Sequence, residues 1–184
     1  MNNGVCQIVV MLLSLYEGLW AAPNPRLKPT DPRTEFDSII ALTRNLLTDT
    51  KTLSNHFVSP AWHHSPSQFR YGFPFLQVSA GLVRFASDLQ SYQRHFEWLK
   101  KAATWLRPME HDIGTVHTRL ERLLRRLEHL MTKLNVTRTN DAFPTLPTHG
   151  THWSAVQAGH AIVHSFHLYL DWAARVLVLI RNKL

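Results

Sequence analysis

The chain has 184 residues, which is long enough for one domain of ordinary size with a substantial core. Hydrophobic residues make up 45% of it and only seven residues are glycine, which favours a packed, mainly helical protein over a disordered chain. Lysine and arginine number 20 against 13 aspartates and glutamates, and this net charge of +7 favours acidic partners.

The segment 1–22 has the features of a secretory signal peptide. Residues 8–15 form an uncharged apolar run, and Ala21 and Ala22 supply the small side chains that precede a cleavage site. The run is about half as long as a helix that crosses a bilayer, so we expect no stable membrane insertion. The alternative is a buried or membrane-anchoring helix, because the extreme N-terminus carries no lysine or arginine. The pattern predicts a secreted, extracellular protein.

The single cysteine, Cys6, lies inside the predicted signal peptide, so the mature chain would have to be held together by its core alone. Four prolines make 23–32 an extended leader that cannot be helical. At its end, Asp31 followed by Pro32 predicts a helix start, with a hydrogen-bond acceptor at the N-cap and proline at the first helical position. The remaining residues, 33–184, form the predicted domain.

Four segments of this domain repeat apolar residues at three- and four-residue spacing, as amphipathic helices do. They predict helices at about 33–57, 79–103, 108–134 and 152–182. Two connections, 58–78 and 135–151, contain prolines and glycine and show no such period. The residues expected to face the core are Phe36, Ile39, Ile40, Leu46, Leu47, Leu53 and Phe57 in the first helix, Leu82, Phe85, Ala86, Leu89, Tyr92, Phe96, Leu99 and Ala103 in the second, Met109, Ile113, Val116, Leu120, Leu123, Leu124, Leu127, Leu130, Met131 and Leu134 in the third, and Val156, His160, Val163, Phe166, His167, Leu170, Ala173, Ala174, Leu177 and Ile180 in the fourth.

The lengths of the connections predict the order of the helices in space. A helix of about 25 residues spans about 38 Å at 1.5 Å per residue. The first and third connections, of about 21 and 17 residues, extend that far at about 3.3 Å per residue, whereas the short second one does not. A long first, a short second and a long third connection are typical of a bundle in which the long connections are crossovers that join parallel helices. We expect an all-α, long-chain four-helix bundle with up-up-down-down topology, although a simple up-down bundle also tolerates these lengths.

Signatures of catalysis are missing from the sequence. It has no Gly-x-Ser-x-Gly, no glycine-rich phosphate loop, no His-Glu-x-x-His and no cysteine outside the signal peptide, so we expect no enzyme. His160, His164 and His167 are the candidate metal site, because their spacing puts the rings on one helical face. No aspartate, glutamate or cysteine completes a ligand set, and two of the three lie on the core face. We therefore interpret these histidines as neutral and hydrogen-bonded, and we expect no metal or cofactor.

The third helix carries a row of cations on its polar face: Arg119, Arg122, Arg125, Arg126, His129 and Lys133. Glu121 and Glu128 compensate part of this charge. One interpretation is an ordinary solvated face. The other is a docking face for an acidic protein or a heparin-like polysaccharide, and a secreted basic helical protein that binds such chains or anionic membrane surfaces is the alternative function. Nucleic acid is not expected, because the signal peptide removes the chain from it and no platform of aromatic and basic residues is evident.

Two further positions are candidates for contact with other molecules. Trp153 precedes the first core position of the last helix, so it either anchors an interface or packs under the preceding connection. Asn135, Val136 and Thr137 form an N-glycosylation sequon where the third helix should end, which in a secreted chain predicts an exposed site.

Several segments resemble the interleukin-11 family, which belongs to the interleukin-6 class of four-helix-bundle cytokines. The last two of them are specific, because an arbitrary amphipathic helix does not reproduce LDWAxR with its flanks. The N-terminal pattern is also similar to the family: a signal peptide with a lone cysteine, then a proline-rich leader that ends in Asp-Pro-Arg. The segments are FDSIIALTRNLLTDT (36–50), DLQSYQRHFEWLKKA (88–102), TRLERLLRRLEHLMTKL (118–134) and AGHAIVHSFHLYLDWAARVLVLIRNKL (158–184).

The resemblance implies a cytokine that binds the interleukin-11 receptor alpha chain and two copies of the signalling receptor glycoprotein 130, and thereby triggers JAK/STAT signalling. Three surfaces carry this assembly in the family. The alpha-receptor surface lies at the C-terminal end of the last helix, where Arg175 matches, and one surface for glycoprotein 130 lies at the start of that helix, where Trp153 matches. The other uses outward faces of the first and third helices, where the matching residues are Ile40, Arg44, Arg119 and Leu123.

The helical pattern is consistent with an outward role for Leu123, because only one of Leu123 and Leu124 is expected to point fully inward. The connection at 58–78 has no evident similarity to the family and is shorter, so none of the family's contacts from that connection is transferred.

Overall fold

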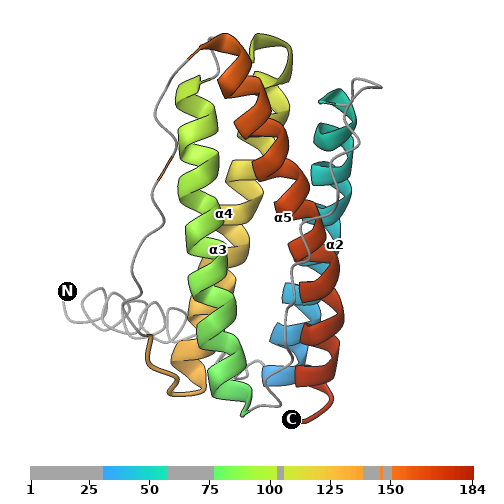
Figure 1. Cartoon of the computed structure of the whole chain (residues 1–184). Coiled ribbons are helices and arrows are strands. Elements are labelled where there is room, and N and C mark those ends of the chain that lie inside the picture. The colour runs from blue at the N-terminus through green and yellow to red at the C-terminus, as the bar shows by residue number, and fades with distance from the viewer. Residues whose placement is uncertain (1–30, 58–76, 103–105, 139–145, 147–150) are drawn as a thin grey trace, which may run out of the picture. The chain divides into compact units, whose positions relative to one another are not determined.

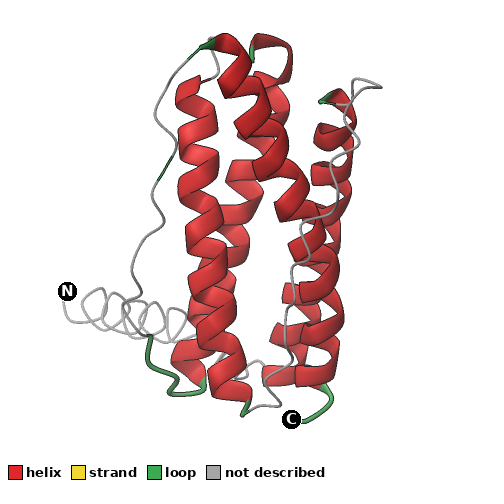
Figure 2. Cartoon of the chain, in the orientation of Figure 1, coloured by secondary structure: helices red, strands yellow, loops and turns green. Residues whose placement is uncertain are grey.

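Four α-helices make up most of the described part of the chain. The computed structural model describes residues 31–57, 77–102, 106–138, 146 and 151–184. Figure 2 shows helices and loops, and no strand, in these residues, which confirms the predicted all-α class. No helix end differs from its expected position by more than two residues. The elements are α2 (Pro32–His56), α3 (Val78–Lys101), the short 3-10 helix η2 (Arg107–Met109), α4 (Glu110–Lys133) and α5 (His152–Arg181).

The starts of α2 and α5 are capped by local side-chain hydrogen bonds. The Asp31 carboxylate caps α2 by accepting the Arg33 amide at 3.1 Å, and Pro32 occupies the first turn. The Thr151 hydroxyl caps α5 by accepting the Ser154 amide at 3.3 Å. Such caps stabilise a helix because first-turn amides have no partner inside it. The predicted signal peptide at 1–22 and the leader up to residue 30 lie outside the described residues.

The end of α4 is a Schellman motif. Asn135 follows the C-cap residue with a positive φ of 52°, a left-handed conformation that asparagine tolerates better than most residues. The Asn135 amide donates to the Thr132 carbonyl at 3.2 Å and the Val136 amide to the Met131 carbonyl at 2.9 Å. The sequon predicted from the sequence therefore begins at the residue that terminates α4.

Each of α2 and α3 lies against both α4 and α5. Contacts at both ends of these helix pairs show that α2 is antiparallel to α4 and to α5, and that α3 is antiparallel to α5. Hence α2 and α3 run one way and α4 and α5 run the other, as the colours in Figure 1 show, which confirms the up-up-down-down topology. The contacts are Glu35 with Lys133, Asp49 with Arg119, Asp37 with Arg181, Phe57 with His160, Phe85 with Tyr169, and Phe96 with Phe166.

The core lies between the four helices and is richest in aromatic rings between α3 and α5. The Tyr92 ring centroid lies 4.7 Å from that of Phe166 and 5.1 Å from that of Tyr169. Tyr169 is fully buried, and its hydroxyl donates to the Phe85 carbonyl at 3.5 Å. Burying the phenol is tolerated because this oxygen has a partner.

At the start of α5 the buried face differs from the predicted one. The prediction placed Val156 and His160 inward, whereas the buried residues are Ala155 and Gly159, and Val156 and His160 are half-buried. A Cβ at Gly159 would lie 3.0 Å from Cε1 of Phe57, so the backbone of α5 lies close against the ring of the residue that ends α2. The smallest residues face the neighbouring helix because larger ones do not fit.

Candidate functional site

The first candidate surface lies along the seam between α2 and α4. Arg119 of α4 donates to the Asp49 carboxylate of α2 at 2.5 Å while its side chain stays 46% exposed. Arg44 is exposed on α2, five residues before Asp49, which is about one and a half helical turns. Both predicted arginines are therefore accessible, and they lie on neighbouring antiparallel helices, but the spacing turns Arg44 by about 140° around α2 from the Asp49 face that Arg119 contacts.

Ile40 and Leu123, predicted for the same surface, are buried. Ile40 is 6% exposed and Leu123 is not exposed at all, so the expectation that Leu123 points partly outward is wrong. Leu124 is also buried. Since α4 packs against both α2 and α3, its buried face is wide enough to accept two consecutive leucines. On this surface the charged side chains are accessible, and Ile40 and Leu123 lie in the core.

Further along the seam, Glu35 forms a cluster that the sequence did not predict. Its carboxylate is 5% exposed, accepts a hydrogen bond from Lys133 Nζ at 2.9 Å, and lies 3.5 Å from Arg126 Nη1. The hydrogen bond from Lys133 holds the pKa of the Glu35 carboxyl below its ordinary value of 4.5, against the opposing effect of burial. This cluster joins the first turn of α2 to the last turn of α4.

The second candidate surface is the C-terminal part of α5. Arg175 is 73% exposed and pairs with Asp171 one turn earlier on the same helix. Leu179, one turn later, is 53% exposed, which is unusual for a large apolar side chain. Arg175 is the residue that the resemblance implies, whereas Leu179 was not predicted, although four consecutive apolar residues, 177–180, cannot all face the core.

The third candidate surface is the start of α5. Trp153 occupies the first turn of the helix and is 54% exposed. When half of an indole side chain is exposed to water, a binding partner can cover a large apolar area of it. The interpretation in which Trp153 is an accessible surface residue agrees with this exposure. Trp153 and Arg175 lie 22 residues apart on one helix, which corresponds to about 33 Å along the helical rise.

Comparison with known proteins places the chain in a family. The family model for interleukin 11 matches residues 23–184. The chain is 38% identical to interleukin-11 of Macaca fascicularis over 211 residues and 38% identical to interleukin-11 of Homo sapiens over 204 residues, and each alignment covers 99% of this chain and 100% of the relative. Interleukin-11 of Mus musculus is 37% identical with the same coverage. The chain belongs to the interleukin-11 family.

The interleukin-11 family consists of cytokines and not of enzymes. Membership therefore makes this chain a cytokine and confirms both the predicted class and the expectation that it is not an enzyme. An interleukin acts through receptors, so receptor partners follow in general terms. In the described part of this interleukin-11 family member, no helix is both long enough and apolar enough to cross a membrane.

The histidines of this family member are placed in two ways. His160 and His164 stack, with ring centroids 5.8 Å apart, whereas Nδ1 of His167 is buried and has no hydrogen-bond partner among the described residues. In that same part of the chain, no group of three histidines, cysteines or acidic residues is arranged to hold a metal ion. On α4, His117 is also buried, with its Nε2 3.7 Å from Glu121. Burial lowers the pKa of both His117 and His167 below the ordinary 6.5.

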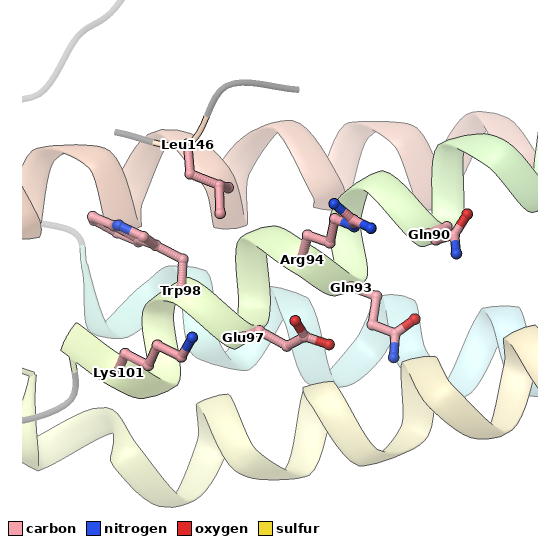
Figure 3. A pocket seen from close by; sticks show the side chains of 7 residues that line it. All are labelled: Gln90, Gln93, Arg94, Glu97, Trp98, Lys101 and Leu146. Carbon is pink, nitrogen blue, oxygen red and sulfur yellow. The ribbon is translucent and has the colours of Figure 1, made fainter. Parts of the chain in front are cut away.

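A hollow of about 430 Å³ lies on the outer side of α3, and Figure 3 shows the side chains that line it. Glu97 lies there among cations, Arg94 and Lys101, next to the largely buried Trp98, and Leu146 covers one side. None of the predicted site residues lines this hollow. Its mixture of opposite charges and amides gives it no marked preference for an anion or a cation.

Proposed function

We propose that this cytokine is secreted and acts by holding an alpha receptor, of the interleukin-11 receptor alpha type, next to the signalling receptor glycoprotein 130, so that JAK/STAT signalling begins. The apolar run at 8–15 supports secretion. In the secretory pathway Asn135 would be available for glycosylation, since it is exposed at the end of α4.

The observation that supports this proposal is the separation of the three candidate surfaces on one bundle. Arg175 and Leu179 lie near one end of α5, Trp153 lies at the other end, and Arg119 lies on the α2–α4 seam. A packed four-helix core holds these surfaces at fixed distances, which lets one molecule contact several proteins without the partners colliding. The alpha receptor is assigned to Arg175 and Leu179, and glycoprotein 130 to the other two surfaces.

Arg119 on the seam and the exposed Arg44 of α2 are proposed to contact glycoprotein 130 directly. Ile40 and Leu123 lie in the core, so their proposed role at this surface is to position the helices beneath the two arginines.

The receptor complex assembles because binding to the first receptor raises the effective concentration of the cytokine near the second. A first receptor that binds weakly holds the cytokine at a cell membrane, and the second binding event then becomes nearly intramolecular. Affinity for the complete assembly can therefore exceed the affinity of any single surface. Signalling requires the receptors to be brought together, so loss of one surface should abolish signalling without unfolding the protein.

Replacing Trp153 with alanine tests the proposal. An exposed tryptophan at the centre of an interface often contributes about 2 kcal/mol or more to binding, whereas truncating it costs a folded bundle little. We expect Trp153→Ala to retain its circular dichroism spectrum and alpha-receptor affinity but to lose receptor-dependent phosphorylation in cells that carry both receptors.

Leu146→Ala is the matched control, because Leu146 is also an exposed apolar residue and lines the hollow on α3, which contains none of the residues of the three surfaces. It should signal normally. Full phosphorylation by Trp153→Ala would remove this residue from the signalling surface, and loss of signalling by both variants would show that the effect is not specific.

A further inference from the structure

A second hollow, of about 520 Å³, lies where the end of α3 meets the first half of α4. We call it the basic groove. Lys100 lines it from α3, and Gly114, Thr118, Arg119 and Arg122 line it from α4. Apart from Arg119, these residues lie outside the three candidate receptor surfaces.

The cations of α4 differ in what they contact. Those that face α2 are satisfied within the protein: Arg119 pairs with Asp49, and Arg126 and Lys133 pair with Glu35. Lys100 and Arg122 are exposed, and neither is paired with a carboxylate among the residues that the structure describes. Of the cations that remain available to an external anion, Lys100 and Arg122 lie together in the basic groove, whereas Arg125, which is also exposed on α4, lies outside the lining of the groove.

The carboxylate that lines the basic groove, Glu110, lies in the first turn of α4. Arg122 lies 12 residues further along that helix, about 18 Å away by the helical rise. An anion is therefore favoured toward the Arg122 end of the groove. The hollow in Figure 3 differs, because there Glu97 lies among the cations.

The lining of the basic groove excludes a typical protein–protein anchor. The large hydrophobic side chains exposed in the described residues are Leu146, Trp153, Leu179 and Leu184, and none of them lines the groove. Protein interfaces bury aromatic or apolar residues at their centre, whereas sulfated polysaccharides are bound through charge and hydrogen bonds. An open polar groove with unpaired cations fits the second class.

Gly114 keeps the groove open. A Cβ added at this position would meet no atom within 4 Å, so packing in the described residues does not require glycine there. Glycine inside a helix costs about 1 kcal/mol relative to alanine. The absent side chain leaves space on the face of α4 between Lys100 and Arg122.

We propose that the basic groove binds a sulfated polysaccharide of the heparin type. Sulfate oxygens accept hydrogen bonds from the guanidinium of Arg122 and the ammonium of Lys100, with Arg119 sharing its charge between Asp49 and the ligand. This site is additional to receptor binding. Lys100 and Arg122 are chosen for the test because neither belongs to a proposed receptor surface.

The test measures binding of the purified chain to an immobilised, size-defined heparin oligosaccharide at several sodium chloride concentrations. We expect the Lys100→Ala/Arg122→Ala variant to bind about 25-fold more weakly than wild type, because each of the two cations near an anionic surface contributes about a factor of five in affinity. We also expect binding of the wild type to fall steeply with salt. Gly114→Glu, which puts a carboxylate into the groove, should weaken binding as well.

The matched control is Lys101→Ala/Arg33→Ala, which removes the same net charge. Lys101 lines the other hollow and Arg33 lies in the first turn of α2, at the other end of the bundle. This control should bind heparin within about twofold of wild type. Equal loss in both double variants would show diffuse attraction and overturn the site. The proposal would also be overturned if the wild type did not bind heparin at all. Binding of poly-glutamate as tight as that of heparin would overturn it too, because it would indicate an acidic protein as the ligand.

Discussion

Gly114 of α4 and Gly159 of α5 are both inside helices, but their surroundings are opposite. A Cβ at Gly114 would meet nothing within 4 Å, whereas a Cβ at Gly159 would meet Phe57 Cε1 at 3.0 Å and Leu99 Cδ2 at 3.3 Å. Both neighbours of Gly159 are core residues with little freedom to move. The same substitution should therefore have opposite effects at the two sites.

We expect Gly114→Ala to raise the free energy of unfolding by about 1 kcal/mol, which is the helix-propensity difference. Gly159→Ala gains the same propensity, but overpacking against Phe57 costs about 1–3 kcal/mol, so its free energy of unfolding should fall by about 1 kcal/mol. Urea unfolding followed by circular dichroism measures both. A stabilised Gly159→Ala would mean that α2 and α5 can separate slightly at little cost.

Burial of single residues was only partly predictable from the sequence. Spacing of three and four correctly assigned Phe36, Leu46 and Leu120 to the core. Spacing did not predict that Leu123 and Leu124 are both buried, because it gives the direction of a buried face and not its width. That width depends on how many neighbouring helices pack against α4, which is a property of the tertiary structure.

At the scale of elements, Glu35 links two helix ends that are far apart in sequence. Its partner Lys133 is 98 residues away, and both side chains are partly or wholly removed from water. A buried carboxylate that keeps its charge needs such a partner. The cluster therefore fixes the register of α2 against α4.

Glu35→Gln should lower the free energy of unfolding at pH 7 by about 1 kcal/mol, because a charge-assisted hydrogen bond becomes a neutral one. The folded pKa of Glu35 is lowered, so its contribution is present above the ordinary value of 4.5 and is lost as the pH falls through the folded value. The difference between wild type and variant should disappear in acid. Urea titrations at pH 7 and pH 3 measure it.

Asp37→Asn is the comparison, since Asp37 pairs with Arg181 but is 53% exposed. We expect it to change stability by less than about 0.5 kcal/mol. A Glu35→Gln effect no larger than this would show that the cluster is as weak as a surface ion pair.

Helix boundaries were the most predictable feature of the fold, because their causes are local. Asp31 and Pro32 lie next to the start that they define, and Asn135 lies next to the end that it defines. Of the candidate site, Trp153 and Arg175 were named from the sequence and the resemblance, and both side chains are exposed, while their receptor roles stay predictions. The Glu35 cluster and the basic groove did not, because each depends on residues that only tertiary packing brings together.

At the scale of the whole molecule, the buried His117 and the half-buried His167 make stability depend on pH. His117 lies on α4 near Lys100 of α3, which disfavours its protonated form, while Glu121 and Glu97 favour that form only in part. His167 lies on α5 with its Nδ1 buried. Both imidazoles are therefore held neutral at helix interfaces.

Because the folded pKa of each histidine is lowered, the unfolded chain binds more protons below the ordinary value of 6.5. The contribution of the two histidines to the free energy of unfolding is fully present above pH 6.5. It is lost as the pH falls through their pKa values in the folded protein. We expect the thermal midpoint to drop between pH 7.5 and pH 5. The His117→Gln/His167→Gln variant should show a shallower drop over the same range, measured by circular dichroism.

His111→Gln is the control for that series, since His111 is exposed and is not among the groups that act on the pKa of His117 or His167. Its pH dependence should match that of the wild type. An unchanged slope in the His117→Gln/His167→Gln variant would assign the acid sensitivity to other groups.

The ion pair between Asp37 and Arg181 places the beginning of α2 and the end of α5 at one end of the bundle, while Trp153 begins α5 at the other end. A bulky protein fused after Leu184 would therefore crowd Arg175 and Leu179 and leave the indole accessible. Such a fusion offers a route to a competitive antagonist that engages one receptor and sterically blocks recruitment of the next.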